Sequence, residues 1–577
     1  MYFGLATDYL RALLHTLDLS HTQTSLLFLR SSTQSTIAAP RLRFRYAFTW
    51  AQMASKSSLL CPLEAYQTAL DLLPQFVWFG ATVSQRYEDL STAETLAVRA
   101  ASAAIASSNC TLALEWLEHA RCVVWTQSLA LRSPLTDLHA THPAIATRLR
   151  KVADALHSVS LESRESRAVS SGTMTPEQVA QQHSRMATDY NDLLYHVRTL
   201  PGFEDFLQPL KIMALVAAAR HGPIAVINCD EHGCDALVIL PGQDNITHIP
   251  LPNFNKQKAR HVRFEMGKCL RNKRVRDGRV ERHVLVQDQA EEFEIVLAAL
   301  WHDVVKPVLD HLGYTKRISS TDLPHITWCP TGPLSFLPLH AAGDYDQYGC
   351  RVFDYVISSY TPTLTALLAS KPSTLSPDSR ILAIGQADTP GQAPLPGTAK
   401  ELDFIKAHAQ GKVEYTQLTD DQATVSAVLD AMEHHDWVHL ACHAHQDAQD
   451  PTQSSFFLYD GNLDLVSINR RSLASKGLAF LSACQTATGD SALPDEAIHL
   501  ASGMLMAGYS SVIGTMWPVV DEDAPFVADK VYGQLMQDGK IGNGEAGKAL
   551  HKAVAALRER EGEESFGRWV PYIHIGS

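Results

Sequence analysis

Two short stretches decide how this sequence is interpreted: 437-WVHLACHAHQD-447 and 478-LAFLSACQTATGD-490. Each contains an apolar run that ends in a potentially reactive side chain, His443 in the first and Cys484 in the second. Continuous apolar runs are typical of parallel strands that are buried on both faces. Reacting groups of open α/β sheets gather at the carboxyl ends of the strands. Neighbouring strands, about 5 Å apart, would therefore bring these two side chains together.

A thiol and an imidazole in this arrangement predict nucleophilic catalysis. A free thiol with a pKa of about 8.5 is only slightly ionised at neutral pH, and an imidazole beside it can take the proton. The imidazolium can then protonate a leaving amine. Taken singly, a cysteine after an apolar strand is usually a small buried hydrophobic residue. The interpretation therefore depends on the pair.

The two stretches resemble the signatures of the CHAT family of caspase-like cysteine peptidases, which is related to separases, caspases and gingipains. The resemblance continues through 493-LPDEAIHLASGMLMAGYSSVIGTMWPVVDEDA-524 and 569-WVPYIHIG-576, and it extends to residues 323–345 and 358–370. It implies a cysteine endopeptidase that cleaves protein substrates with a His443/Cys484 dyad and without a cofactor.

The resemblance also implies an oxyanion site made of the backbone N–H groups of Ala444 and Cys484. The family commonly has Gly directly after the dyad histidine, whereas this chain has Ala444. A side chain at this position is costly if the backbone needs a positive φ. A catalytically inactive CHAT-like scaffold that binds partners therefore stays open as an alternative.

A strand at 511-SVIGTMW-517 follows the cysteine strand through one helix, and a right-handed crossover would place the two strands side by side. Trp517 and 518-PVVDEDA-524 are then expected to line the pocket for the side chain that precedes the cut, as the resemblance also implies. Asp521 could pair there with a substrate Lys or Arg. It could instead cap a helix that begins near Ala524, and Trp517 alone would make an apolar pocket.

The stretch from His443 to Asp447 is also similar to the H-x-H-x-D-H motif of metallo-β-lactamase-type hydrolases. The sixth position is Ala448, so one ligand is missing, and no distal histidine pattern replaces it. A metal-dependent hydrolase is therefore a minor alternative, and we expect no metal site.

Other residues with metal-binding or catalytic side chains are expected to be structural. Cys229 and Cys234 have no matching second pair, which argues against a structural zinc site. His439 precedes His443 by four residues, roughly 13 Å along a strand, which is too far for it to join the dyad. His340 is expected to be structural as well.

Composition restricts the class of protein. A chain of 577 residues is too long for one core, and 45% apolar with 19% charged residues describes an ordinary globular protein. The net charge of −13 argues against nucleic acid as a general partner. The ten cysteines, scattered without close pairs, predict reduced thiols and a cytoplasmic location. No apolar run reaches 18 residues, so no membrane span is expected. The apolar stretch near the N-terminus is not preceded by basic residues, so no signal peptide is expected.

The spacing of apolar residues along the chain changes once, from a helical pattern to one that alternates strands and helices. Residues 1–215 predict an all-α region, and residues 216–577 predict an α/β domain with a mostly parallel sheet and helices on both faces. Within this domain we expect a core peptidase unit at about 375–577 and an N-terminal subdomain at about 216–374.

The all-α region resembles tetratricopeptide repeats. Helices are expected at 43–54 and 64–74, and a second helical hairpin pairs 92–107 with 111–125. No strict 34-residue period is present, so either a degenerate repeat or a plain bundle is possible. Repeat arrays have extended surfaces, and this region is expected to hold a protein substrate or regulator. The sequence predicts no oligomeric state.

Several local signals predict where elements begin and turn. Thr175 and Pro176 predict the start of a helix. Residues 222–240 predict two strands joined by a turn at 230–233, with 247–252 extending their sheet. Thr398 and Glu401 have the spacing of a capping box.

Overall fold

The chain was studied as a computed structural model. The structure describes residues 5, 8, 19–35, 37–56, 61–160, 175–274, 287–316, 323–369, 379–446, 454–471, 473, 476–483, 486, 495, 499–537 and 545–576. The chain divides into two compact units, Met1–Lys211 and Ile212–Ser577. No helix in the described ranges is long and apolar enough to cross a membrane.

The described part of the first unit is helical. Its helices are α2 (Leu19–Thr33), α3 (Pro40–Lys56), α4 (Leu63–Phe76), α5 (Val83–Ser91), α6 (Leu96–Ala106), α7 (Cys110–Ala120), α8 (Val123–Arg132), α9 (Thr136–Thr141), α10 (Pro143–Ser160) and α12 (Pro176–Arg198). Helices α3 and α4 pack as one antiparallel pair and α6 and α7 as another, as the sequence predicts. The predicted helix 111–125 is broken, because Cys122 adopts a left-handed backbone conformation with φ 51° between α7 and α8.

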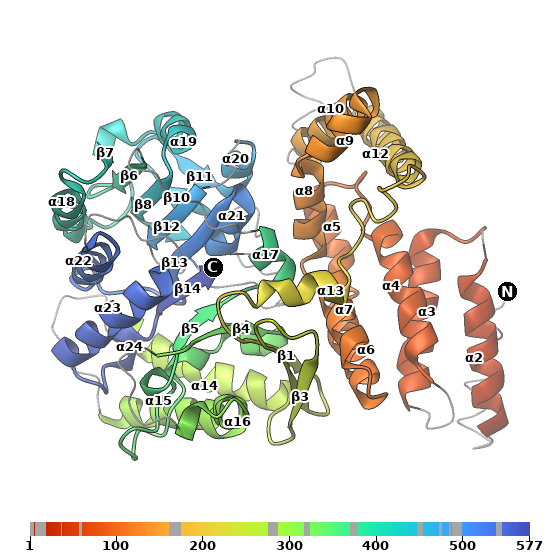
Figure 1. The fold of residues 1–577 in the computed structure, drawn as a ribbon, viewed down its shortest axis with the longest axis horizontal. Coiled ribbons are helices and arrows are strands. Elements are labelled where there is room, and N and C mark those ends of the chain that lie inside the picture. The colour runs from red at the N-terminus through yellow and green to blue at the C-terminus, as the bar shows by residue number, and fades with distance from the viewer. Residues whose placement is uncertain are drawn as a thin grey trace. The chain divides into compact units, whose positions relative to one another are not determined.

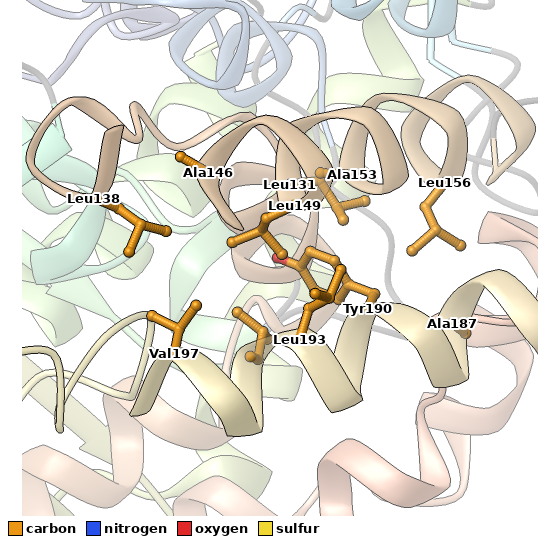
Figure 2. Packing of buried hydrophobic residues seen from close by; sticks show 11 residues of the cluster. Leu131, Leu138, Ala146, Leu149, Ala153, Leu156, Ala187, Tyr190, Leu193 and Val197 are labelled. Carbon is orange, nitrogen blue, oxygen red and sulfur yellow. The ribbon is translucent and has the colours of Figure 1, made fainter. Parts of the chain in front are cut away.

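The apolar faces of this unit point inward. Figure 2 shows one cluster, in which side chains of α10 and α12 point toward each other around Tyr190. Helix α12 begins as predicted, because Thr175 accepts a hydrogen bond from the Gln178 N–H while Gln178 bonds back to the Thr175 N–H. Trp50, Trp116 and Trp125 are buried, and Trp78 is partly buried against this cluster.

The second unit is an α/β domain. Its strands are β1 (Ile224–Cys229), β2 (Cys234–Ile239), β3 (Ile246–Leu251), β4 (His325–Pro330), β5 (Ile357–Tyr360), β6 (Arg380–Gly385), β7 (Glu414–Thr419), β8 (Trp437–Ala441), β9 (Ala444–His445), β10 (Ser455–Phe457), β11 (Asn462–Asp464), β12 (Lys476–Ser482), β13 (Tyr509–Thr515) and β14 (Tyr572–Gly576). Its helices are α13 (Ile212–Leu215), α14 (Lys256–Arg274), α15 (Gln287–Leu300), α16 (Lys306–His311), α17 (Leu364–Ala369), α18 (Gly397–Ala409), α19 (Val425–His434), α20 (Leu465–Asn469), α21 (Leu500–Ala507), α22 (Ala524–Leu535), α23 (Ala546–Glu561) and α24 (Phe566–Trp569).

In the described residues, eleven strands form one sheet in the order β3-β2-β1-β4-β5-β14-β13-β12-β8-β6-β7. Strands β1, β4, β5 and β14 run parallel to one another, and β13, β12, β8, β6 and β7 run parallel in the opposite direction. The antiparallel pair β13/β14 joins the two sets. This mostly parallel sheet, preceded by an all-helical region, confirms the predicted fold class.

Helices cover both faces of the sheet around its second half. Figure 1 shows α18, α22 and α23 on one side and α19, α20 and α21 on the other. Strands β8, β12 and β13 are consequently almost entirely buried. Double-sided burial explains why each of them appears in the sequence as a continuous apolar run.

The local predictions for this unit are partly confirmed. The hairpin β1/β2 turns at Asp230–Gly233, and β3 extends its sheet. The capping box at Thr398 and Glu401 is wrong, because α18 begins at Gly397 and Thr398 lies inside it, donating its hydroxyl to the Leu395 carbonyl. Glu401 instead accepts a hydrogen bond from His439, which no local pattern could have indicated.

Candidate active site

Four neighbouring strands end at the same edge of the sheet. Strand β8 lies between β6 and β12, and β12 pairs with β13, all in parallel. The register pairs Ala441 of β8 with Gly385 on one side and Ser482 on the other, so these strands end level. The predicted placement of β13 beside the cysteine strand is therefore confirmed as a parallel pair.

His443 follows β8 by two residues and its side chain is partly exposed. Its Nε2 lies 2.7 Å from the carbonyl oxygen of Ala393, in the segment between β6 and α18. A carbonyl oxygen can only accept, so Nε2 carries the hydrogen in the neutral ring and Nδ1 is left as the basic nitrogen. The backbone contact thus fixes both the orientation of the imidazole and its tautomer.

Ala444 lies in the short strand β9, opposite Phe456 of β10. The Phe457 N–H donates to the His443 carbonyl at 2.9 Å, and hydrogen-bonded pairs alternate along an antiparallel ladder. The Ala444 N–H therefore points away from β10. Among described residues other than glycine, a positive φ occurs at Ser108, Cys122, Leu207 and Asp420, so Ala444 has an ordinary backbone that accommodates its Cβ.

Cys484, which follows β12 in the sequence, lies outside the described residues, and its predicted role stays a prediction. The described residues on either side of it are held by the end of β13. The Thr515 hydroxyl donates to the Ala483 carbonyl at 2.8 Å, and the Thr515 N–H donates to Thr486 Oγ1 at 2.9 Å. Thr486 and Thr515 are both buried.

These two threonines and Ala393 contact residues of the candidate site, and the sequence did not predict them. The contribution of Ala393 is a backbone carbonyl, which any residue type provides. Thr515 and Thr486 act on segments that are distant along the chain, so no spacing rule connects them.

Trp517 and Asp521 follow β13 but have different surroundings. Trp517 is 6% exposed, donates its indole N–H to the Gly567 carbonyl at 3.2 Å and packs edge-on against Phe293. Asp521 is half-buried and accepts a hydrogen bond from the Gly397 N–H at 2.8 Å, at the start of α18. Burial raises the pKa of the Asp521 carboxyl, and this hydrogen bond offsets part of the rise.

The expectation that Asp521 caps the helix near Ala524 is wrong, because Asp521 caps a different helix. Helix α22 does begin at Ala524, but the helix N-terminus that Asp521 caps is that of α18. The segment after β13 is anchored by Asp523, whose fully buried carboxylate accepts hydrogen bonds from Arg560 and Arg568.

The two histidines that were predicted to be structural are confirmed as such. His439 is fully buried, and its Nε2 donates to Glu401 at 3.0 Å while Nδ1 faces the Tyr532 hydroxyl at 3.3 Å. His340 uses both ring nitrogens, with Tyr360 and the Val570 carbonyl each at 2.8 Å. Burial lowers the pKa of His340 to about 4, so its ring is neutral at pH 7.

Within the described residues, no group of three or more His, Cys, Asp or Glu side chains is arranged to hold a metal ion. Asp447, the fifth position of the metallo-hydrolase motif, lies outside the described residues. The exposed His445 is two positions after His443, on strand β9.

Comparison with known proteins identifies the C-terminal half of the chain. Residues 294–577 match the family model of the CHAT domain. No curated protein sequence matches the chain.

Several solved structures are similar to the chain at low sequence identity. The Arg-specific cysteine proteinase gingipain R matches with 11% identity and a TM-score of 0.34, over 48% of this chain and 68% of that chain. The Porphyromonas gingivalis RgpB pro- and mature-domain complex matches with the same identity and TM-score, over 48% and 69%. Separase in the Saccharomyces cerevisiae separase–securin complex matches with 9% identity and a TM-score of 0.46. That match covers 100% of this chain and 49% of the separase chain, so the chain spans about half the length of separase.

Proposed function

We propose that the CHAT domain, residues 294–577, is a cysteine endopeptidase in which Cys484 is the nucleophile and His443 the general base and acid. The observation that carries the proposal is the hydrogen bond between His443 Nε2 and the Ala393 carbonyl. It leaves Nδ1 as the proton acceptor at the edge of the sheet where β8 and β12 end level.

The proposed reaction proceeds in two steps. His443 Nδ1 takes the thiol proton of Cys484, and the thiolate attacks the scissile carbonyl to form a tetrahedral oxyanion. The N–H groups of Ala444 and Cys484 stabilise this oxyanion. His443 then protonates the leaving amine, and an acyl-enzyme remains. A water molecule, deprotonated by the same imidazole, hydrolyses the thioester and regenerates the thiol.

The first prediction tests this dyad with a tagged, thiol-reactive peptide probe and a peptide-cleavage assay. Replacing Cys484 or His443 by Ala should lower the cleavage rate by several orders of magnitude, as for other catalytic units. Cys484→Ala should also abolish covalent labelling. His445→Ala is the matched control, because this exposed neighbour makes no part of the proposed chemistry.

Cleavage that is unchanged by His443→Ala, or labelling that survives Cys484→Ala, would contradict the assignment. A wild-type protein that neither cleaves nor labels while remaining folded would favour the alternative, a non-catalytic CHAT-like scaffold. A bound-metal measurement that finds stoichiometric metal would favour a metal-dependent hydrolase.

We also propose Asp521 and Trp517 as residues of the pocket that holds the side chain before the cut. Asp521 supports this better than Trp517, since its carboxylate is half-buried and interacts electrostatically with His443, although burial keeps the pKa of Asp521 above its usual value. Trp517 is almost completely buried and could act only as a wall. The helical region of residues 1–215 is proposed to hold a protein substrate or regulator.

A further inference from the structure

Cys229 and Cys234 face each other at the end of the β1/β2 hairpin. The ladder register makes them direct partners. The Asp230 N–H closes the turn by donating to the Gly233 carbonyl at 3.0 Å, whereas the Cys229 N–H points the other way and donates to Thr331 Oγ1 at 2.9 Å. The two cysteines therefore form a non-hydrogen-bonded pair, the type in which partner Cα atoms lie about 4.5 Å apart.

This separation suits a disulfide. Bridged cysteines have Cα atoms about 4.4–6.8 Å apart, and side chains of direct cross-strand partners project from the same face of the sheet. The two thiols interact in the reduced protein, since a hydrogen bond with Cys229 is the largest cause of the raised pKa of Cys234. An S–S bond can therefore form here with a small movement of the two strand ends.

We propose that Cys229 and Cys234 are a dithiol site that a peroxide or a small disulfide oxidises reversibly to an intramolecular disulfide. With hydrogen peroxide, one thiolate takes up an oxygen atom to give a sulfenic acid, and the other thiol attacks that sulfur and releases water. One S–S bond replaces two S–H bonds, and the two electrons pass to the peroxide, which leaves as two waters. With a small disulfide, one thiolate displaces one small thiol to form a mixed disulfide, and the second cysteine displaces the other small thiol. A reducing dithiol reverses the reaction by exchange.

The surroundings make the pair slow to react rather than inert. Both cysteines are buried, and the pKa of Cys234 is raised by its hydrogen bond with Cys229, by burial and by the carboxylates of Asp235 and Asp230. The thiolate is the reactive form, so the reduced pair persists at neutral pH and oxidises faster as the pH rises. The turn residues Glu231 and His232 are exposed, so opening of the last ladder pair gives a small oxidant access.

The disulfide is expected to change local structure more than it stabilises the fold. It closes a loop of six residues, and the stabilisation from such a link grows with loop length. Its position is informative, because the Cys229 N–H holds Thr331, and the next residue, Gly332, donates its N–H to Asp495 Oδ1 at 2.9 Å. Asp495 is buried and lies in the sequence between Cys484 and α21. Oxidation is therefore expected to weaken the hydrogen bond that Gly332 donates to Asp495.

A mass measurement tests the disulfide directly. Trypsin cleaves after Arg220 and Lys256, and the peptide 221–256 contains Cys229, Cys234 and no other cysteine. After treatment of the intact protein with hydrogen peroxide or glutathione disulfide, acid quenching and alkylation, this peptide should lack both alkyl groups and weigh two hydrogen atoms less than the dithiol. Dithiothreitol before alkylation should restore the doubly alkylated form. A peptide that stays doubly alkylated up to pH 9, or that is oxidised only to sulfinic acid or to mixed disulfides, overturns the proposal.

Hydrogen exchange tests the connection to Asp495 without any assay of activity. Peptides that contain Gly332 should exchange faster in the oxidised wild type than in the reduced wild type. Cys234→Ser, treated with the same oxidant, is the matched control and should show no such difference. Equal exchange in both forms of the wild type, with the disulfide complete, would overturn this connection. Because neither readout involves cleavage, a failed peptidase proposal and a failed dithiol proposal are distinguishable.

Discussion

At the scale of single residues, Ala444 departs from the family pattern without straining the backbone. It lies in a strand with an ordinary φ, so the glycine that the family commonly has at this position is not required by the backbone. We expect Ala444→Gly to change the peptide-cleavage rate by less than about tenfold, equivalent to about 1.4 kcal/mol. Glycine in a strand costs about 0.5–1 kcal/mol, so the variant should unfold at slightly lower denaturant concentration. A much larger rate gain would show that the Ala444 Cβ obstructs the proposed oxyanion site.

Asp521 has a second role that decides which substitution is informative. Its carboxylate caps α18 through the Gly397 N–H, so Asp521→Ala would disturb that helix as well as remove a charge. Asp521→Asn keeps an acceptor oxygen for Gly397 and removes only the charge. In a positional peptide library, wild type should prefer Lys or Arg before the cut, and Asp521→Asn should lose that preference while its melting temperature changes little. The melting temperature should change little because Asp523, which pairs with Arg560 and Arg568, still anchors this segment in the variant. The acidic pocket would be contradicted if wild type showed no preference for a basic residue, or if Asp521→Asn kept that preference.

At the scale of elements, the strand pair β5/β14 is linked to its neighbours β4 and β13 through the partly buried His325 and the buried His574. Strands β14 and β5 pair at Ile575 and Tyr360. His574 on β14 bonds to Ser359 of β5 at 2.6 Å and to Ser511 of β13 at 2.8 Å, and Ser359 also bonds to His325 of β4 at 2.6 Å. Burial lowers the pKa of His574 to about 3 and that of His325 to about 4.

These low pKa values predict that acid destabilises this domain. An unfolded histidine has a pKa of about 6.5, so between that pH and the folded pKa the unfolded chain binds more protons than the folded one. The histidines therefore impose no penalty above pH 6.5, and stability is lost as the pH falls. Each contributes a slope of about 1.4 kcal/mol per pH unit. His574→Gln should reduce the slope of unfolding free energy between pH 6 and 5 by about this amount, as measured by denaturant titration. Equal slopes in wild type and variant would contradict a neutral buried His574.

Local sequence patterns predicted the strands of the sheet well, because a strand that is buried on both faces appears as one continuous apolar run. The strands β8, β12 and β13 and the hairpin β1/β2 all appear where apolar runs and turn residues predict them. Predictions failed where a distant partner claimed a side chain. Glu401 bonds to His439 and not to its own helix, and Asp521 caps α18 and not α22.

The same limit applies to the candidate site. A histidine at the end of β8 could be predicted from one stretch, but its hydrogen bond with Ala393 could not, since it depends on how a loop some fifty residues earlier folds. Likewise the cysteines appear scattered in the sequence, whereas the turn at Asp230–Gly233 brings Cys229 and Cys234 into direct register. Spacing alone does not show which face of a strand a thiol occupies or what lies opposite.

At the scale of the whole molecule, the chain comprises two compact units, and the match to the CHAT family begins at residue 294, inside the second. The first unit contains none of the proposed catalytic groups. Its antiparallel helix pairs are the kind of architecture that offers an extended surface to a protein. We therefore propose that it recruits protein substrates or a regulator, and that catalysis itself resides in residues 212–577.

This division predicts how the two units contribute to cleavage. The fragment 212–577 has its own sheet and core and should fold alone, as judged by a cooperative thermal transition. It should cleave a short peptide at the rate of the full chain, because a short peptide contacts only the site at the ends of β8 and β12. On a whole-cell protein extract, the full chain should generate new N-termini that the fragment does not. If the helical unit adds about 1.4 kcal/mol of binding free energy for a protein substrate, the full chain should cleave that substrate about tenfold faster than the fragment at low enzyme concentration. If the folded fragment produced the same cleavages at the same rates, the helical unit would have no part in selecting substrates. If the fragment were faster than the full chain on the short peptide, the helical unit would instead restrain the peptidase.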